Sequence, residues 1–358
     1  MYDAFTLVLK VNHACNLRCS YCYTGAKFNR PMPARVAKAA VDRAVASLRP
    51  EGLLELGFFG GEPLLEARFI ASTLSYAREL SAARGLRLSC GLTTNGTCVD
   101  PDAWDILCDP GVQLSVSHDG LPETHDRHRL AINGRGTSSE VEKTLRRLVA
   151  AGRDFNVVMV VRPDTATSLP EGVQWLRQLG VRRVEPSLDL WTRWSSEDED
   201  QLVDSIAACA ELWRGGLPDF SVSWFDEKLA RIAGVPMDAG ARCGFGEGQI
   251  AVAPSGNLYP CERLIGEDGP SHPMRLSGTA LEGTDFLACR GSERSATSSC
   301  AGCPGERYCG TTCRCSNYVR TGSPEIPDGL LCSVDRICFQ ETLRVMNLTS
   351  PEAGGAHA

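Results

Sequence analysis

Residues 13–23 read HACNLRCSYCY and directly follow the run FTLVLKV at residues 5–11. The run is rich in β-branched residues and predicts a strand, so the cysteines would lie on the loop at its carboxyl end. Ligands of α/β proteins bind at this end of parallel strands. Three thiols spaced C-x3-C-x2-C suit three irons of a cubic [4Fe-4S] cluster, with the fourth iron left open. Structural thiols, or part of a zinc site, are the alternatives.

Strand and helix patterns alternate after this loop. Apolar runs predict strands at 53–59, 86–94, 112–117, 155–161 and 181–186. Apolar residues at helical spacing predict helices at 34–48, 67–83, 101–107, 139–151 and 170–179, and Asp100 is the expected N-cap of the third. This alternation is typical of right-handed βαβ units and a parallel sheet. Six strands are too few for a closed eight-stranded barrel, so we predict an open, partial (β/α)6 TIM-like barrel over residues 1–195. A doubly wound sheet is the alternative.

The composition excludes several classes of protein. The chain has 358 residues, 43% hydrophobic and 23% charged, which is ordinary for a globular protein of about two domains. It has no apolar run of about 18 residues and no secretory signal pattern, so we expect a cytoplasmic protein without a membrane partner. A net charge of −7 argues against a broad basic surface for nucleic acid.

The cysteines are unusually many and unevenly placed. There are 17, an odd number, and in a cytosolic chain they favour metal or redox chemistry over disulfides. Ten fall after residue 240. We therefore predict a helical connection over 196–240, a cysteine-rich domain with a β-hairpin and short helices over 241–345, and a flexible tail over 346–358.

Further motifs lie at the ends of the predicted strands. Gly60-Gly61-Glu62-Pro63 follows the second strand, Thr94-Asn95-Gly96 ends the third, and Ser117-His118-Asp119-Gly120 ends the fourth. Arg129 lies twelve residues beyond Ser117. With Cys15, Cys19, Cys22 and the aromatic Tyr21, this ordered set resembles the radical S-adenosylmethionine (SAM) superfamily over roughly residues 5–195.

The resemblance implies an enzyme that binds SAM at the open iron of the Cys15/Cys19/Cys22 cluster. Reduction of that cluster would cleave SAM to a 5′-deoxyadenosyl radical, which abstracts a hydrogen atom. The SAM-binding residues it implies are, for the amino group, Gly60, Gly61, Glu62 and Pro63; for the ribose, Thr94 and Asn95; for the carboxylate, Ser117 and Arg129; and for the adenine, Tyr21. An arginine suits the carboxylate because it can bind both oxygens.

The C-terminal cysteines form a second pattern. Gly256 and Cys261 give G-x4-C, and the cysteines from 300 to 313 give C-x2-C-x5-C-x3-C, with Cys332 after a gap. This pattern resembles the SPASM extension of radical SAM enzymes, which carries two auxiliary [4Fe-4S] clusters. Residues 250–253 and 257–259 look like the two strands of its hairpin.

The SPASM resemblance also implies which cysteines hold each cluster. The outer cluster would take Cys300, Cys303, Cys309 and Cys332, and the inner cluster Cys243, Cys261 and Cys313. Gln249 stands where fully ligated members have a further cysteine. The inner cluster is therefore expected to keep an open iron or to recruit Cys289 or Cys315. A zinc ribbon is the alternative for these cysteines.

By resemblance, the function is oxidative modification of a peptide. We expect a maturase that cross-links or otherwise oxidises a side chain of a ribosomally synthesised peptide, with a flavodoxin- or ferredoxin-type reductant. Because the first strand begins at residue 5, we expect the leader to bind a separate protein or the barrel edge. Glu262 follows Cys261, where sulfatase-maturing members carry a base. The alternatives are an anaerobic sulfatase-maturing enzyme, a small-molecule radical SAM dehydrogenase, an electron-transfer iron–sulfur protein and a zinc-stabilised binding module.

Overall fold

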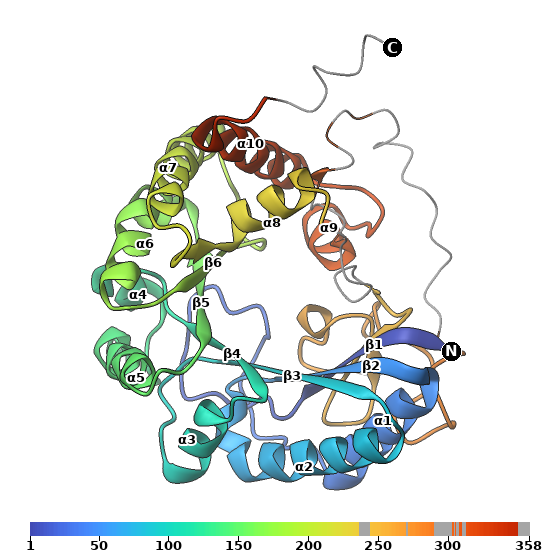
Figure 1. Cartoon of the computed structure of the whole chain (residues 1–358). Helices are drawn as coiled ribbons and strands as arrows, with labels where there is room; N and C mark the ends of the chain where they lie inside the picture. Colours follow the sequence, from blue (N-terminus) through green and yellow to red (C-terminus); the bar gives the residue numbers. More distant parts are fainter. Residues whose placement is uncertain are drawn as a thin grey trace, which may run out of the picture. The chain divides into compact units, whose positions relative to one another are not determined.

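The computed structural model describes residues 1–235, 244–269, 271–289, 303, 305, 308–309 and 313–349. The chain divides into two compact units. Unit 1 comprises Met1–Ser117, His128–Asp154 and Asp238–Arg294, and unit 2 comprises His118–Arg127, Phe155–Met237 and Ser295–Ala358. Figure 1 colours the elements of both units along the sequence.

Unit 1 is built on a sheet with the strand order β4-β3-β2-β1-β8-β9. These strands are β1 (Tyr2–Lys10), β2 (Leu48–Phe59), β3 (Arg87–Thr94), β4 (Val112–Ser117), β8 (Gln249–Val252) and β9 (Leu258–Tyr259). Neighbouring strands from β4 to β8 are parallel, and β9 is antiparallel to β8. Alternate residues of β1, such as Phe5, Leu7 and Leu9, are fully buried, because the parallel sheet is covered by other elements.

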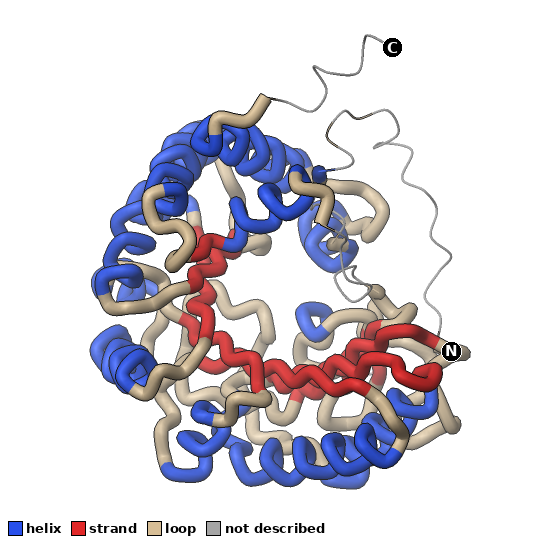
Figure 2. The backbone as a smooth tube through the Cα atoms, in the orientation of Figure 1, coloured by secondary structure: helices blue, strands red, loops and turns tan. Residues whose placement is uncertain are grey.

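Helices of unit 1 connect the strands and cover the sheet. They are α1 (Ala34–Ser47), α2 (Ala67–Ala83), α3 (Pro101–Cys108) and α5 (Ser138–Ala150), with the 3-10 helices η1 (Pro63–Glu66) and η4 (Glu262–Leu264). Figure 2 shows α1 and α2 along one face of the strands. Asp100 caps α3 as predicted, since its carboxylate accepts a hydrogen bond from Ala103 N at 3.1 Å.

Unit 2 repeats the alternation with shorter strands. The parallel strands β5 (Phe155–Val161), β6 (Arg183–Leu188) and β7 (Ser221–Val222) are neighbours in that order. Its helices are α4 (Pro122–His128, whose last residue belongs to unit 1), η2 (Pro163–Ser168), α6 (Leu169–Gln178), α7 (Ser196–Arg214), α8 (Ser223–Ile232), α9 (Arg314–Thr321) and α10 (Gly329–Met346). α10 packs against α7 and α8.

The predicted α/β architecture is confirmed. All six predicted strands are present, and neither unit closes its strands into a ring within the described residues. The predicted hairpin is β8 and β9, and β8 also extends the sheet by pairing with β1. The domain limits stay a prediction.

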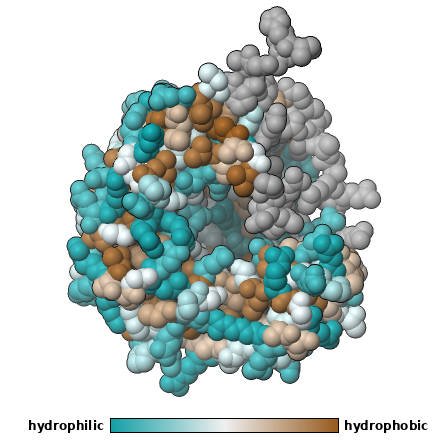
Figure 3. Space-filling view, viewed as in Figure 1, coloured by the Kyte–Doolittle hydropathy of each residue, from teal (hydrophilic) through white to brown (hydrophobic). Residues whose placement is uncertain are grey.

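The structure adds elements that the sequence patterns did not indicate. β2 begins at Leu48, five residues before the predicted start, and α4 has the polar sequence PETHDRH, which carries no apolar period. No described helix is long and apolar enough to cross a membrane. On the face drawn in Figure 3, hydrophilic and hydrophobic residues are interspersed.

Candidate active site

Asn12 holds together the two ends of the cysteine-bearing loop. This residue follows β1 and is 1% exposed. Its Oδ1 accepts hydrogen bonds from Ala14 N at 3.0 Å and Arg30 N at 2.9 Å, while its Nδ2 donates to Glu66 Oε1 at 2.5 Å. One buried amide therefore ties both ends of the loop together and anchors them to η1. The cysteine spacing gave no sign of this role.

The three thiols of the loop lie half-buried, and Cys15 and Cys22 accept hydrogen bonds. Leu17 N donates to Cys15 Sγ at 3.3 Å, and Lys27 Nζ donates to Cys22 Sγ at 3.0 Å. Burial raises the pKa of Cys15 to about 11. Burial also acts to raise the pKa of Cys22, but hydrogen bonds and charge from Thr24 and Lys27 outweigh it and lower that pKa. These donors stabilise negative charge on sulfur, as metal-bound thiolates need.

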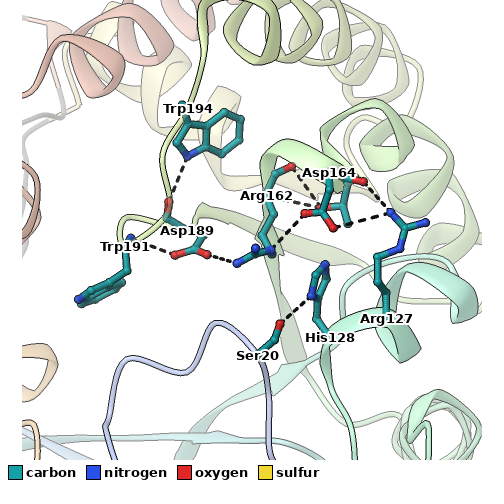
Figure 4. A network of polar contacts seen from close by, with 9 residues as sticks. Ser20, Arg127, His128, Arg162, Asp164, Asp189, Trp191 and Trp194 are labelled. Carbon is teal, nitrogen blue, oxygen red and sulfur yellow. Dashed lines mark hydrogen bonds and ion pairs between the residues drawn. The ribbon is translucent and has the colours of Figure 1, made fainter.

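A second chain segment is paired with the cysteine loop. Arg18 N donates to Leu130 O at 2.7 Å and Ser20 N donates to His128 O at 3.0 Å, so residues 17–20 and 128–131 run side by side. Ser20 Oγ also lies 2.7 Å from His128 Nδ1 (Figure 4). This pairing brings Arg129 to the loop, with its guanidinium 5.3 Å from the ring centre of Tyr21. Two predicted SAM-binding residues are thus neighbours.

Gly60 and Gly61 let the end of β2 approach the cysteine loop closely. A Cβ at Gly60 would lie 2.8 Å from Asn12 O, and a Cβ at Gly61 would overlap the carbonyl of Ala14. In return, Gly61 N donates to Asn12 O at 3.0 Å and Glu62 N donates to Ala14 O at 2.9 Å. The two glycines are therefore needed for the contact between this strand end and the loop.

The Glu62 carboxylate joins the ends of β2 and β3. It is buried, and it accepts hydrogen bonds from Thr94 Oγ1 at 2.6 Å, Asn95 N at 2.7 Å and Leu64 N at 3.0 Å. Burial raises the pKa of Glu62, and these hydrogen bonds act to lower it. Pro63 opens η1 directly after it. The carboxylate therefore organises the strand ends from inside the protein.

Asn95 links β3 to the cysteine loop. Its Nδ2 donates to Asn16 Oδ1 at 2.9 Å and lies 3.8 Å from Cys15 Sγ. Ser117, at the end of β4, is 8% exposed, and Arg129 is 6% exposed. The predicted residues of this site thus lie at strand ends or on segments joined to the loop, all within unit 1.

The donor set of the loop fits a [4Fe-4S] cluster. The three cysteines are free thiols, and they offer three ligands to four irons. Among the described residues, no three Cys, His, Asp or Glu side chains surround a common centre. The assignment of the cluster to this loop therefore rests on its donor chemistry and hydrogen bonds.

In unit 2, a braced loop follows the carboxyl end of β6. Asp189 forms an ion pair with Arg162, which follows β5, and it accepts a hydrogen bond from Trp191 N at 3.0 Å (Figure 4). Trp194 Nε1 donates to Asp189 O at 3.1 Å, and Arg320 donates to Thr192 O at 2.8 Å. Residues 189–194 are thus fixed from several sides, while the Trp191 side chain remains 44% exposed. No sequence pattern indicates a role for this loop.

The predicted auxiliary ligands are divided between the units. Cys243 and Cys300 lie outside the described residues. In unit 1, Cys261 is buried and its thiol donates to Glu262 Oε2 at 3.4 Å. Gln249 lies in β8, where its side chain accepts a hydrogen bond from Gly244 N at 3.3 Å. Cys289 Sγ lies 3.8 Å from the Arg43 guanidinium of α1.

In unit 2, Cys313 and Cys315 are close together. Their sulfur atoms are 3.3 Å apart, at the start of α9, and Ser316 Oγ donates to Cys313 Sγ at 3.2 Å. Cys315 is buried, whereas Cys303 and Cys332 are exposed and Cys309 is half-buried. Of the two spare cysteines considered for the inner cluster, Cys315 is the one that adjoins a predicted ligand.

Comparison with protein families identifies the domain that contains the cysteine loop. Residues 9–176 match the model of the Radical SAM superfamily. The uncharacterized protein MJ0907 of Methanocaldococcus jannaschii is 29% identical over 184 residues, which are 51% of this chain and 62% of that protein.

Two relatives of stated activity match over more of the chain. The cysteine-type anaerobic sulfatase-maturating enzyme of Clostridium novyi is 23% identical, over 72% of this chain and 73% of that enzyme. The PqqA peptide cyclase of Gluconobacter oxydans is 25% identical, over 97% of this chain and 96% of the cyclase.

Solved structures share the fold. Native anSMEcpe with bound AdoMet superposes with a TM-score of 0.78 at 20% identity, covering 96% of this chain and 98% of that one. Streptococcus suis SuiB bound to the precursor peptide SuiA gives a TM-score of 0.63 at 16% identity, covering 92% and 76%. At these identities the likeness shows a common fold.

Proposed function

The chain carries a radical SAM domain, which implies SAM and a [4Fe-4S] cluster, and we propose that it is a maturase acting on a side chain of a ribosomally synthesised peptide. The proposed modification is a cross-link or another oxidative change. The observation that carries the peptide assignment is the match to a peptide cyclase over 97% of the chain, since it includes the cysteine-rich region.

The bound cofactors would supply a 5′-deoxyadenosyl radical for hydrogen abstraction. The residues of the chain bind and orient them. Cys15, Cys19 and Cys22 would hold three irons, and the donors Leu17 N and Lys27 Nζ stabilise their sulfur charge. Asn12 and the paired segment 128–131 fix the loop, so its cysteines would hold the cluster in one place.

The remaining SAM contacts are proposed from where the other predicted SAM-binding residues lie. Arg129, held beside Tyr21, would bind the carboxylate with Ser117, while Tyr21 would contact the adenine. Backbone carbonyls of the Gly60–Pro63 segment would accept from the amino group, because the Glu62 carboxylate is already occupied inside the protein. Thr94 and Asn95 would lie at the ribose.

Two auxiliary clusters complete the proposal. Cys300, Cys303, Cys309 and Cys332 would bind the outer one, and Cys243, Cys261 and Cys313 the inner one, with Cys315 as a candidate fourth ligand. Glu262, which directly follows Cys261, would take a proton from the substrate, and an auxiliary cluster would supply an electron acceptor. A flavodoxin or ferredoxin would reduce the catalytic cluster.

The experiment is a product assay with the reconstituted protein, SAM and a reductant. The probes are precursor peptides encoded beside the gene, and mass spectrometry follows them. Loss of two hydrogen atoms from a peptide, with 5′-deoxyadenosine formed in step, is the expected result. Glu262→Gln should keep SAM cleavage but depress this product. If every such peptide remains unchanged while SAM is cleaved, the peptide assignment is wrong.

Anaerobic sulfatase maturation is the second candidate, because sulfatase-maturating enzymes also match over 72% of the chain. A sulfatase-type peptide with one cysteine separates the two. Conversion of that cysteine to formylglycine, with no change in the precursor peptides, would favour sulfatase maturation.

A further inference from the structure

One face of α10 carries Cys332 and contacts Tyr308, the residue before Cys309. Both cysteines are predicted ligands of the outer auxiliary cluster. Cys332, Asp335 and Phe339 are spaced three and four residues apart on this helix, so they share a face. The Tyr308 ring stacks on Phe339 with ring centres 4.7 Å apart. Because Cys309 follows Tyr308, this stacking places the Cys309 segment against the helix that carries Cys332.

A buried lysine from α8 holds the same segment. Lys228 is 3% exposed, and its Nζ donates to Tyr308 O at 2.8 Å and to Asp335 Oδ1 at 2.5 Å. Tyr308 is thus fixed at its ring by Phe339 and at its carbonyl by Lys228. Asp335 lies one turn after Cys332. The Lys228 ammonium therefore links Tyr308, the residue before Cys309, to the turn of α10 that bears Cys332.

The energetics of this ion pair favour a positioning role. Removing a lysine and an aspartate from water costs several kcal/mol per ion, and a buried pair seldom stabilises a fold more than apolar residues of similar size. The hydrogen bond to Tyr308 O is different, because an apolar replacement cannot make it. A geometric requirement at Tyr308 would explain why a charged side chain occupies this buried place.

We propose that Lys228 is a positioning residue for the outer auxiliary cluster, holding the Cys309 segment against the helix that bears Cys332 through Tyr308 O and Asp335. This inference rests on the proposed function, which assigns both cysteines to that cluster. Asp335 orients the ammonium, and Phe339 supports the Tyr308 ring. All of these residues belong to unit 2.

The test uses the full-length chain with Cys15, Cys19 and Cys22 changed to alanine, so that iron reports the auxiliary clusters alone. After anaerobic reconstitution this background should bind about 8 iron atoms per chain, at four irons per cluster. Lys228→Met should lower the content to about 4 and remove one component of the electron paramagnetic resonance spectrum of the reduced protein. Lys143→Met, an exposed lysine of unit 1, is the matched control and should change neither.

A double variant separates positioning from packing. Lys228→Met with Asp335→Leu removes both charges of the pair, so it should recover thermal stability relative to Lys228→Met alone. Its iron content should stay at about 4, because Tyr308 O still has no ammonium donor. Recovery of about 8 irons in the double variant, or a full content in Lys228→Met, would overturn the proposal.

Cys332→Ala in the same background tests the ligand assignment independently. A loss of about 4 irons supports it. If Cys332→Ala loses no iron, the proposed outer-cluster ligands are wrong and the inference fails with them. If Cys332→Ala loses iron but Lys228→Met does not, the ligand set holds and only the role of Lys228 is rejected.

Discussion

The cysteine loop of unit 1 and the cysteine-bearing residues 303–332 of unit 2 are held in different ways. In unit 1, the loop is bonded by the Asn12 amide, by the Gly60-Gly61 strand end and by the backbone of residues 128–131. In unit 2, Cys303 and Cys332 are exposed, and Lys228 and Phe339 contact Tyr308, the neighbour of Cys309.

This difference indicates two ways to prepare a cluster site. Hydrogen bonds within the polypeptide organise the backbone of the first loop. The second region has side-chain contacts of its own, such as the ion pairs of Arg314 with Glu325 and of Arg320 with Asp328. Cys303 and Cys332 are nevertheless exposed, so cluster binding would add more order there than at the first loop. The catalytic site would therefore tolerate metal loss better than the auxiliary region.

The largest expected effect comes from Gly61→Ala, which breaks the order of the first loop. The added Cβ would overlap the Ala14 carbonyl, so the strand end or the loop must move. We expect SAM cleavage to fall about 1,000-fold, corresponding to about 4 kcal/mol. Gly91→Ala in β3 is the control, since its Cβ would meet nothing within 4 Å. Equal activities in the two variants would show that the close approach is unimportant.

Removal of iron by a chelator tests the comparison directly. Amide hydrogen exchange should accelerate about 100-fold in residues 313–332, where the cluster would supply the order. Residues 12–20 should keep most of their protection, because their hydrogen bonds come from Asn12, β2 and residues 128–131. Similar acceleration in both regions would mean that the first loop also depends on metal.

Arg129→Met should have a smaller effect, confined to SAM. Loss of charge-assisted hydrogen bonds to a carboxylate costs about 2 kcal/mol, so SAM should bind about 30-fold more weakly. Equilibrium binding of SAM to the reconstituted protein measures this. Arg146→Met is the control, because its ion pair with Glu142 lies on the exposed face of α5. Unchanged SAM affinity in Arg129→Met would remove this residue from the proposed site.

The smallest effect is expected at the loop after β6. Trp191 is exposed on a loop fixed by Arg162, Trp194 and Arg320, which is a favourable arrangement for contacting a peptide. Trp191→Ala should raise the KM for a modified peptide about 5-fold, with SAM cleavage in the absence of peptide unchanged. The control is Leu281→Ala, another exposed apolar residue, in unit 1. A peptide KM equal to that of the control would exclude Trp191 from substrate binding.

Local sequence patterns were sufficient for the six predicted strands and for the cysteine loop, but they missed β7 and the first five residues of β2. Residues 155–161, for example, form an apolar run bounded by a turn, and they are β5. The contacts that order the sites lie far apart in sequence and have no local pattern. Lys228 and Asp335 are 107 residues apart, and Arg18 pairs with Leu130 only because the chain folds back. α4 was missed because a helix of polar residues lacks the apolar period on which the prediction depended.

The measurement that tests the account most directly is iron and sulfide content after anaerobic reconstitution, together with SAM cleavage, in the wild type and in the Cys15/Cys19/Cys22→Ala variant. One catalytic and two auxiliary clusters predict about 12 iron atoms per chain in the wild type and about 8 in the variant, with SAM cleavage lost. About 4 irons in the wild type, with zinc bound by the remaining cysteines, would contradict the account. The C-terminal cysteines would then be a structural zinc site.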